Sequence, residues 1–222
     1  MHAPWRTGVV AGATALVIAA TLGPPALAQG DCANADPRPG PGDAAAFEHS
    51  VVCLVNAERE ESGRPRLQQD WRLARAAELH ATDMVVREYF SHFSPGGSDV
   101  VERLRRVGYL PQRRFWMAGE VLSWGILWRS TPKAAVDAWL DSLPHRRAML
   151  EPGFREIGAG AKLGNPVRHD YDGVTVAVEL GRVGSRADTD HTRGARPDAH
   201  SSADDGRFEL ARILRLGDGL IL

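Results

Sequence analysis

The chain has 222 residues, of which 27 are basic and 28 acidic, so its formal net charge at pH 7 is −1. Such a balanced charge excludes a general electrostatic attraction to nucleic acid, and we expect no nucleic-acid partner. The length suits one domain with a sizeable core and an appendage, since single domains commonly have about 100 to 200 residues.

The N-terminus is typical of a secretory signal peptide. Arg6 precedes an uncharged run over residues 7–22, and Ala26-Leu27-Ala28 supplies the small residues that a signal peptidase accepts. The apolar run is shorter than the roughly 20 residues that a membrane-spanning helix needs. We therefore expect a signal peptide over residues 1–28, a mature form without a transmembrane anchor, and secretion to the extracellular side of the cell envelope.

The mature N-terminus, residues 29–42, is expected to be flexible because it is rich in Pro and Gly. It contains Cys32, and the only other cysteine of the chain is Cys53. Export to an oxidising compartment permits a disulfide between these two residues, which would join the flexible segment to the first helix. We expect that disulfide, and the alternative is a pair of unlinked thiols.

Apolar spacing, together with start and stop signals, predicts four helices. Turn-forming residues around His92 interrupt the helical pattern, which places His92 on a loop between helices. The first expected helix is capped by Asp43 and ends at about Glu61, and the second starts after Asp70. The third is capped by Ser98, and the fourth starts at Pro132 and is stopped by Pro144.

Three runs have the composition of strands: 115–125, Ile157 to Leu163 and Val174 to Leu180. A polar loop separates the last two, which predicts a hairpin. Because helices come first and strands last, the pattern favours an α+β layer fold over alternating βαβ units.

A polar tail is expected over residues 184–222. Between residues 184 and 206 the chain has too few apolar groups to offset the entropy of ordering, which predicts disorder. Phe208 to Leu216 forms a short amphipathic end segment that either docks on a surface or is inert, and we favour the inert interpretation.

Four motifs occur in an order and spacing that are specific when taken together. The chain resembles the bacterial CAP superfamily (SCP domain), whose members include cysteine-rich secretory proteins, antigen 5 and plant pathogenesis-related proteins. The resemblance spans about Phe47 to Gly181 and implies a CAP/SCP domain over residues 43–183. It implies an α-β-α sandwich with a small central antiparallel sheet flanked by helices. The motifs are Leu54-Val55-Asn56-Ala57-Glu58-Arg59, Tyr89-Phe90-Ser91-His92-Phe93-Ser94-Pro95, Ala118-Gly119-Glu120, and Ala138-Trp139-Leu140-Asp141-Ser142 through Pro144-His145-Arg146.

Members of this superfamily have a cleft lined by two histidines and one or two acids. These positions correspond here to His92, Glu120 and His145, which are far apart in sequence, so only the fold can bring them together. Two imidazoles and a carboxylate can hold a divalent metal such as zinc and leave positions open for water or ligand. His92 and His145 are the expected metal ligands.

The chain departs from the family pattern at three positions of this cleft. Val121 replaces a common Asn, which we expect to remove a polar group from the cleft, and Pro144 replaces the Gly before the second histidine. Ser142 stands where relatives with a fuller set have a second acid, and the nearby Asp137 and Asp141 point to other faces of the helix. We therefore expect a site of three residues.

A structural interpretation of the same residues stays open. In it, His92 and His145 are buried histidines that bond to Glu120 or to the backbone and hold the loops over the sheet. We expect His80 at the edge of the core rather than as a ligand. The tryptophans are expected to be packing residues, with an exposed ligand platform as the alternative: Trp116, Trp124, Trp128 and Trp139. The clustered arginines are expected to form solvated faces: Arg103, Arg105, Arg106, Arg113 and Arg114.

The leading hypothesis for function is a monomeric extracellular binding or interaction module whose cleft accepts a metal ion, lipid, glycan or peptide. One alternative is a metal-dependent hydrolase that uses His92, Glu120 and His145 on a peptide or cell-wall substrate. Another is a structural cell-envelope protein with a vestigial cleft. No residue is assigned a catalytic role, because the sequence contains no His-Glu-x-x-His, Gly-x-Ser-x-Gly or phosphate-binding glycine motif.

Overall fold

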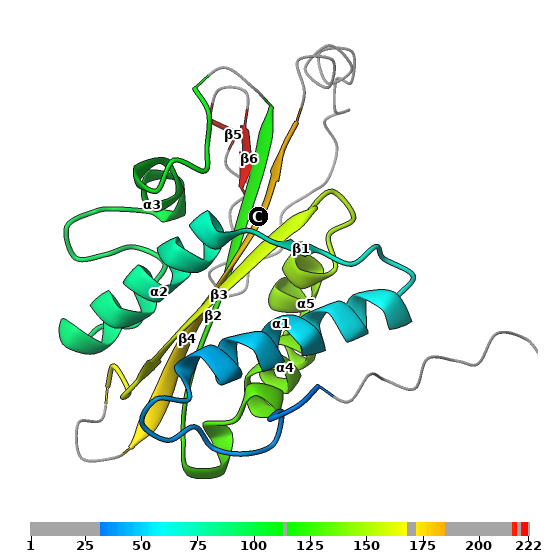
Figure 1. Ribbon diagram of the computed structural model, residues 1–222. Coiled ribbons are helices and arrows are strands. Elements are labelled where there is room, and N and C mark those ends of the chain that lie inside the picture. The colour runs from blue at the N-terminus through cyan, green and yellow to red at the C-terminus, as the bar shows by residue number, and fades with distance from the viewer. Residues whose placement is uncertain (1–31, 113–114, 168–171, 185–214, 217–218, 222) are drawn as a thin grey trace, which may run out of the picture.

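The computed structural model describes residues 32–112, 115–167, 172–184, 215–216 and 219–221 (Figure 1). The expected signal peptide over residues 1–28 and the polar stretch 185–206 lie outside the described residues. Of the expected tail, residues 215–216 and 219–221 form two short strands, and the rest of the amphipathic end segment is likewise outside the described part.

A sheet with the strand order β1-β3-β4-β2-β6-β5 forms the centre of the molecule. Its long strands are β2 (Trp116–Ile126), β3 (Glu156–Leu163) and β4 (Gly173–Val183), and β4 pairs antiparallel with both of the others. The predicted hairpin is confirmed by the pairing of β3 with β4. The edges differ from the expected all-antiparallel sheet, because β1 (Gln68–Gln69) pairs parallel with β3 and β6 (Gly219–Ile221) parallel with β2, while β5 (Arg215–Leu216) pairs antiparallel with β6.

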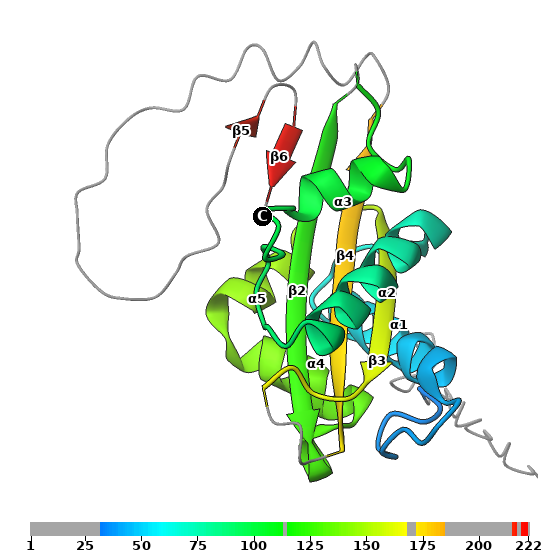
Figure 2. The same cartoon turned by 90° about the vertical axis from the view of Figure 1, so that its left-hand side faces the viewer.

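Helices cover both faces of the sheet, which confirms the α-β-α sandwich. In Figure 2, α2 (Trp71–Val86) and α3 (Val100–Arg106) lie in front of the sheet. The opposite layer contains α1 (Ala44–Glu61), α4 (Pro132–Asp141) and α5 (Leu143–Met149). Each layer encloses its own part of the core. Trp139 and Phe154 are buried on the α1 side, and Leu73 and Leu104 on the α2 side.

Two glycines allow α2 to lie directly on β3. A Cβ atom on Gly158 would lie 2.0 Å from the backbone nitrogen of Ala74, and one on Gly160 would lie 2.0 Å from that of Glu78. Any side chain at these positions would force the helix away from the sheet. The start of α2 is set by Asp70, whose side chain accepts a hydrogen bond from the Arg72 N–H as an N-cap.

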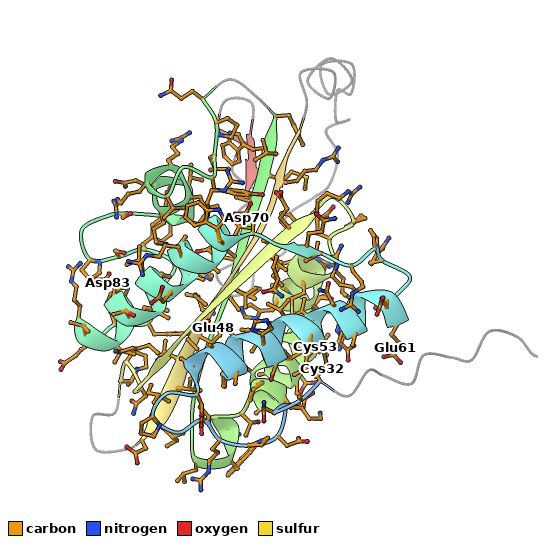
Figure 3. All side chains as sticks on the ribbon, in the orientation of Figure 1. Cys32, Glu48, Cys53, Glu61, Asp70 and Asp83 are labelled. Atoms are coloured by element: carbon orange, nitrogen blue, oxygen red, sulfur yellow. A yellow bond between two sulfur atoms is a disulfide. The ribbon has the colours of Figure 1, made fainter. Side chains whose placement is uncertain are left out.

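The N-terminal segment is fastened to α1. A disulfide joins Cys32 to Cys53, as expected, with 5.6 Å between their Cα atoms (Figure 3). In addition, the Ser50 hydroxyl donates to the Ala33 carbonyl, and the Lys133 N–H donates to the Ala35 carbonyl at 2.9 Å. Segment 32–35 is therefore held by both α1 and α4.

Two helix starts differ from the sequence-based expectation. The N-cap of α3 is Asp99 rather than Ser98, and the Asp99 carboxylate accepts from the Glu102 N–H at 2.8 Å. Pro144 does not stop the chain from being helical; instead it lies in the first turn of α5, where a missing N–H costs nothing. His145 is consequently a helical residue.

Candidate functional site

Three separate elements supply the three predicted site residues. His92 lies on the loop between α2 and α3, Glu120 in the middle of β2, and His145 on α5, which lies beside β2 (Figure 2). The structure joins the first two directly, with 2.6 Å between His92 Nδ1 and Glu120 Oε1. His145 bonds elsewhere, since its Nδ1 lies 2.7 Å from the Ser142 hydroxyl.

Glu120 is the hub of a buried network. Its side chain is only 2% exposed, and its second oxygen, Oε2, accepts from Arg103 Nη2 at 2.5 Å and lies 3.8 Å from His80 Nε2. Burial alone would raise the pKa of Glu120. The hydrogen bond from His92 and then the charge of Arg103 outweigh burial and lower that pKa to about 2. Glu120 is therefore ionised in the folded protein at neutral pH.

Arg103 connects the hub to the loop that carries His92. Its side chain is 6% exposed, and its Nη1 donates to the carbonyls of His92 and Ser98, each at 3.1 Å. The expectation that Arg103 belongs to a solvated face is therefore wrong, although Arg105 and Arg106 are exposed as expected. Arg103 lies three residues after Val100, which is buried. This helical spacing indicates that both residues lie on the inner face of α3.

His80 takes part in the same network from α2. It is fully buried, and its Nε2 lies 3.1 Å from the Ser91 carbonyl, so this nitrogen donates its proton to the loop. Burial lowers the pKa of His80, against the opposing effect of the Glu120 charge. The predicted place at the core edge is too peripheral, because His80 lies against Glu120 inside the protein.

Glu179 also belongs to the network, although the sequence did not predict it as a site residue. It lies in β4 directly opposite Glu120 in the β2–β4 register, and its side chain is 0% exposed. Arg103 Nε lies 3.9 Å from its Oε1. The available signal was a single acid within the otherwise uncharged run from Val174 to Leu180.

Two of the departures from the family pattern, Val121 and Ser142, differ in their effect on the site. The side chain of Val121 does not contact the Glu120 network, whereas Ser142 bonds to His145. Val121 points to the face of the sheet opposite Glu120 and is buried in the core beneath α1 and α4, so it takes no polar group from the His92 side. Ser142, in place of a second acid, is the hydrogen-bond partner of His145. Burial lowers the pKa of His145, so its ring is neutral at neutral pH.

The donor set determines which metal site is chemically feasible. Among the residues that the structure describes, no group of three or more His, Cys, Asp and Glu side chains has the geometry to hold a metal ion. Both oxygens of Glu120 are engaged, by His92 and by Arg103. Each predicted histidine ligand uses Nδ1 in a hydrogen bond, His92 with Glu120 and His145 with Ser142. Nε2 of each ring is therefore the atom that could bind a metal.

A separate cavity of about 510 Å³ opens between α2, the His92 loop and α3. It reaches the network through His80 and Arg103, whereas His92, Glu120 and His145 do not line it. The cavity is therefore distinct from the predicted cleft.

Comparison with known proteins gives consistent results. The sequence model of the Cysteine-rich secretory protein family (CAP) matches residues 52–178. Uncharacterized protein YkwD of Bacillus subtilis (strain 168) is 35% identical over 120 residues, covering 54% of this chain and 44% of the relative. The uncharacterized membrane protein YlbC of the same organism is 32% identical over 113 residues, covering 51% and 31%. The chain thus spans less than half the length of these curated relatives.

One solved structure supports the same fold. It is the crystal structure of an extracellular protein containing an SCP domain from Bacillus anthracis str. Ames. The two sequences are 28% identical, the TM-score is 0.51, and the match covers 63% of this chain and 41% of that chain.

Proposed function

The chain belongs to the cysteine-rich secretory protein (CAP) family, and from this premise we propose that it is an exported binding module that takes a divalent cation such as zinc between His92 and His145. The observation that carries the proposal is the 2.6 Å hydrogen bond between His92 and the buried Glu120. Glu120 is ionised and therefore accepts the Nδ1 proton of His92. With its proton on Nδ1, a histidine binds a metal through Nε2, and this is the arrangement in which a carboxylate orients a metal-ligating histidine.

The state of His145 also suits a ligand. Metal binding requires a neutral imidazole, and the lowered pKa of His145 keeps its ring neutral at neutral pH. The Ser142 hydroxyl, 2.7 Å from Nδ1, fixes the ring and leaves Nε2 for a cation. Ser142 thus orients His145 as Glu120 orients His92.

The proposed site is open and two-coordinate on the protein side. Zinc normally takes at least three protein ligands in closed or catalytic sites, so a cation on two imidazoles needs further donors from water or from the bound molecule. This requirement favours an interaction module, in which an extracellular lipid, glycan or peptide completes the coordination. The engaged oxygens of Glu120 give it the role of holding His92, which argues against the general base of a hydrolase.

Export is part of the proposal and rests on two observations of different kinds. The sequence predicts a signal peptide over residues 1–28, and the related Bacillus anthracis protein is described as extracellular. Over the described ranges, no helix is long and apolar enough to cross a membrane.

Calorimetric titration with Zn²⁺ tests the proposal. The wild-type protein is expected to give a saturable binding heat. The His92→Ala/His145→Ala double variant is expected to bind Zn²⁺ with an affinity at least about tenfold lower, because both ligand nitrogens are removed. His49→Ala is the matched control, since His49 is an exposed histidine on α1 outside the site. Indistinguishable titrations of wild type and double variant would rule out the cation site.

A further inference from the structure

Glu179 is a buried acid without a hydrogen-bond donor. Its side chain is 0% exposed, and no donor among the described residues forms a hydrogen bond with either carboxylate oxygen. An isolated ionised carboxylate in such surroundings is very costly unless it is paired and hydrogen-bonded. The state of Glu179 therefore depends on the groups that face it.

Each element packed around Glu179 contributes a known group. β2 contributes Glu120, the cross-strand neighbour, and α3 contributes Arg103, whose Nε lies 3.9 Å from Oε1. α2 contributes His80 on the side of Glu120, with 3.8 Å between His80 Nε2 and Glu120 Oε2, and burial lowers the pKa of His80 so that it carries no charge at neutral pH. β3 contributes Gly158, the other cross-strand partner, which has no side chain.

The charges of this cluster do not balance if both acids are ionised. One guanidinium, that of Arg103, faces two buried carboxylates. Its Nη2 already donates to Glu120, and its Nη1 donates to the carbonyls of His92 and Ser98. Like charges held this close share one proton rather than ionise together. Glu120 has the hydrogen bonds that stabilise a charge, whereas burial and the charge of Glu120 raise the pKa of Glu179 well above its usual range.

Two carboxyl groups, which both accept hydrogen bonds when ionised, can bond to each other only if one of them carries a proton. We propose that Glu179 is a neutral acid that donates its proton to Glu120, and that this bond makes Glu179 a positioning residue for His92. The order of bonds is then Glu179 to Glu120 to His92, from the interior to a side chain that is 51% exposed. This inference concerns the buried pair and does not depend on which ligand the site takes.

The proposal also accounts for the missing second acid. Position 142 is Ser in this chain, and Glu179 supplies a second carboxyl group to the network from β4 instead. Its contact is with Glu120 beneath the site, so it acts through another residue and does not itself reach the ligand.

Infrared spectroscopy of the full chain at neutral pH tests the protonation state. The wild-type protein is expected to show the carbonyl stretching band of a neutral carboxylic acid, and Glu179→Gln to lack it. Glu48→Gln is the matched control, because Glu48 is a partly buried acid that accepts a hydrogen bond from the Ala161 N–H at 2.8 Å (Figure 3). Absence of the band from wild type, or its persistence in Glu179→Gln, would overturn the proposal.

The positioning role is tested by the NMR signal of the His92 Nδ1 proton. Glu179→Gln keeps a donor toward Glu120 and is expected to retain that signal, whereas Glu179→Leu removes the donor and is expected to lose it by exchange. Equal signals in the two variants would contradict positioning. If the Leu variant does not fold, the infrared comparison of wild type, Glu179→Gln and Glu48→Gln still decides whether Glu179 holds the proton.

Discussion

At the scale of single residues, the buried network depends on Arg103. Its guanidinium contacts both Glu120 and the His92 loop, through bonds of 2.5 Å to Glu120 Oε2 and of 3.1 Å to the His92 carbonyl. Its guanidinium has the planar, multiple donors that such a role needs, which Lys does not provide. The position of His92 is therefore linked to an arginine that does not line the site.

Arg103→Met is expected to lower the free energy of unfolding by about 3 to 5 kcal/mol, because it leaves the Glu120 charge buried without its partner. Urea denaturation measures the change. The matched control is Arg106→Met, since Arg106 forms an exposed pair with Glu102 on the same helix. That variant is expected to cost less than about 1 kcal/mol, and equal costs for the two variants would contradict the network.

The pH dependence of stability is expected to contain a contribution from His80. Its pKa is lowered in the folded state from 6.5, so below pH 6.5 the unfolded chain takes up a proton that the folded protein does not. The contribution of His80 to the free energy of unfolding is thus complete above this pH. It falls by up to about 1.4 kcal/mol per pH unit as the pH drops, until the folded-state pKa of His80 is reached.

Comparison of wild type with His80→Gln isolates this contribution from that of Glu179, whose raised pKa acts in the opposite direction. Urea midpoints measured from about pH 8 to about pH 5.5 should show the variant gaining stability relative to wild type as the solution becomes acidic. A constant difference between the two proteins over this range would show that His80 titrates normally.

At the scale of elements, the contact between α2 and β3 determines where His80 meets the sheet. Gly158 and Gly160 leave no room for a Cβ atom, so the helix backbone rests on the strand. This close approach brings the side chain of His80 within 3.8 Å of Glu120. The site therefore depends on two residues that have no side chain.

Gly160→Ala is expected to cost about 3 kcal/mol or more, because the added methyl group would lie 2.0 Å from the Glu78 nitrogen and the backbone would have to move. Thermal or urea unfolding checks this value. Gly96→Ala provides the control, since a Cβ there meets nothing within 4 Å, and it is expected to change stability by less than about 0.5 kcal/mol. A mild effect at Gly160 would mean that α2 packs less closely.

At the scale of the whole molecule, the sequence predicts the architecture better than the network. Hydrophobic periodicity and turn signals locate the β3–β4 hairpin and the start of α2, because both follow from local chemistry. α5 was missed because Pro144 was interpreted as a stop, although proline is also favoured in a first helical turn.

The buried charges were harder to predict. The family resemblance names His92 and Glu120, and the structure places them in contact. Arg103 and Glu179 were not predicted because their partners come from other elements, and residue type alone favours the surface for both. Tertiary register, which pairs Glu120 with Glu179, is not contained in the local sequence of either strand.

The most direct test of the account is anomalous diffraction at the zinc edge from crystals of the protein grown with Zn²⁺. We predict a peak about 2.0–2.1 Å from Nε2 of both His92 and His145, with Nδ1 of His92 still bonded to Glu120. A zinc-edge map with no peak between these two rings, or with the His92 ring turned so that Nδ1 faces the ion, would contradict it.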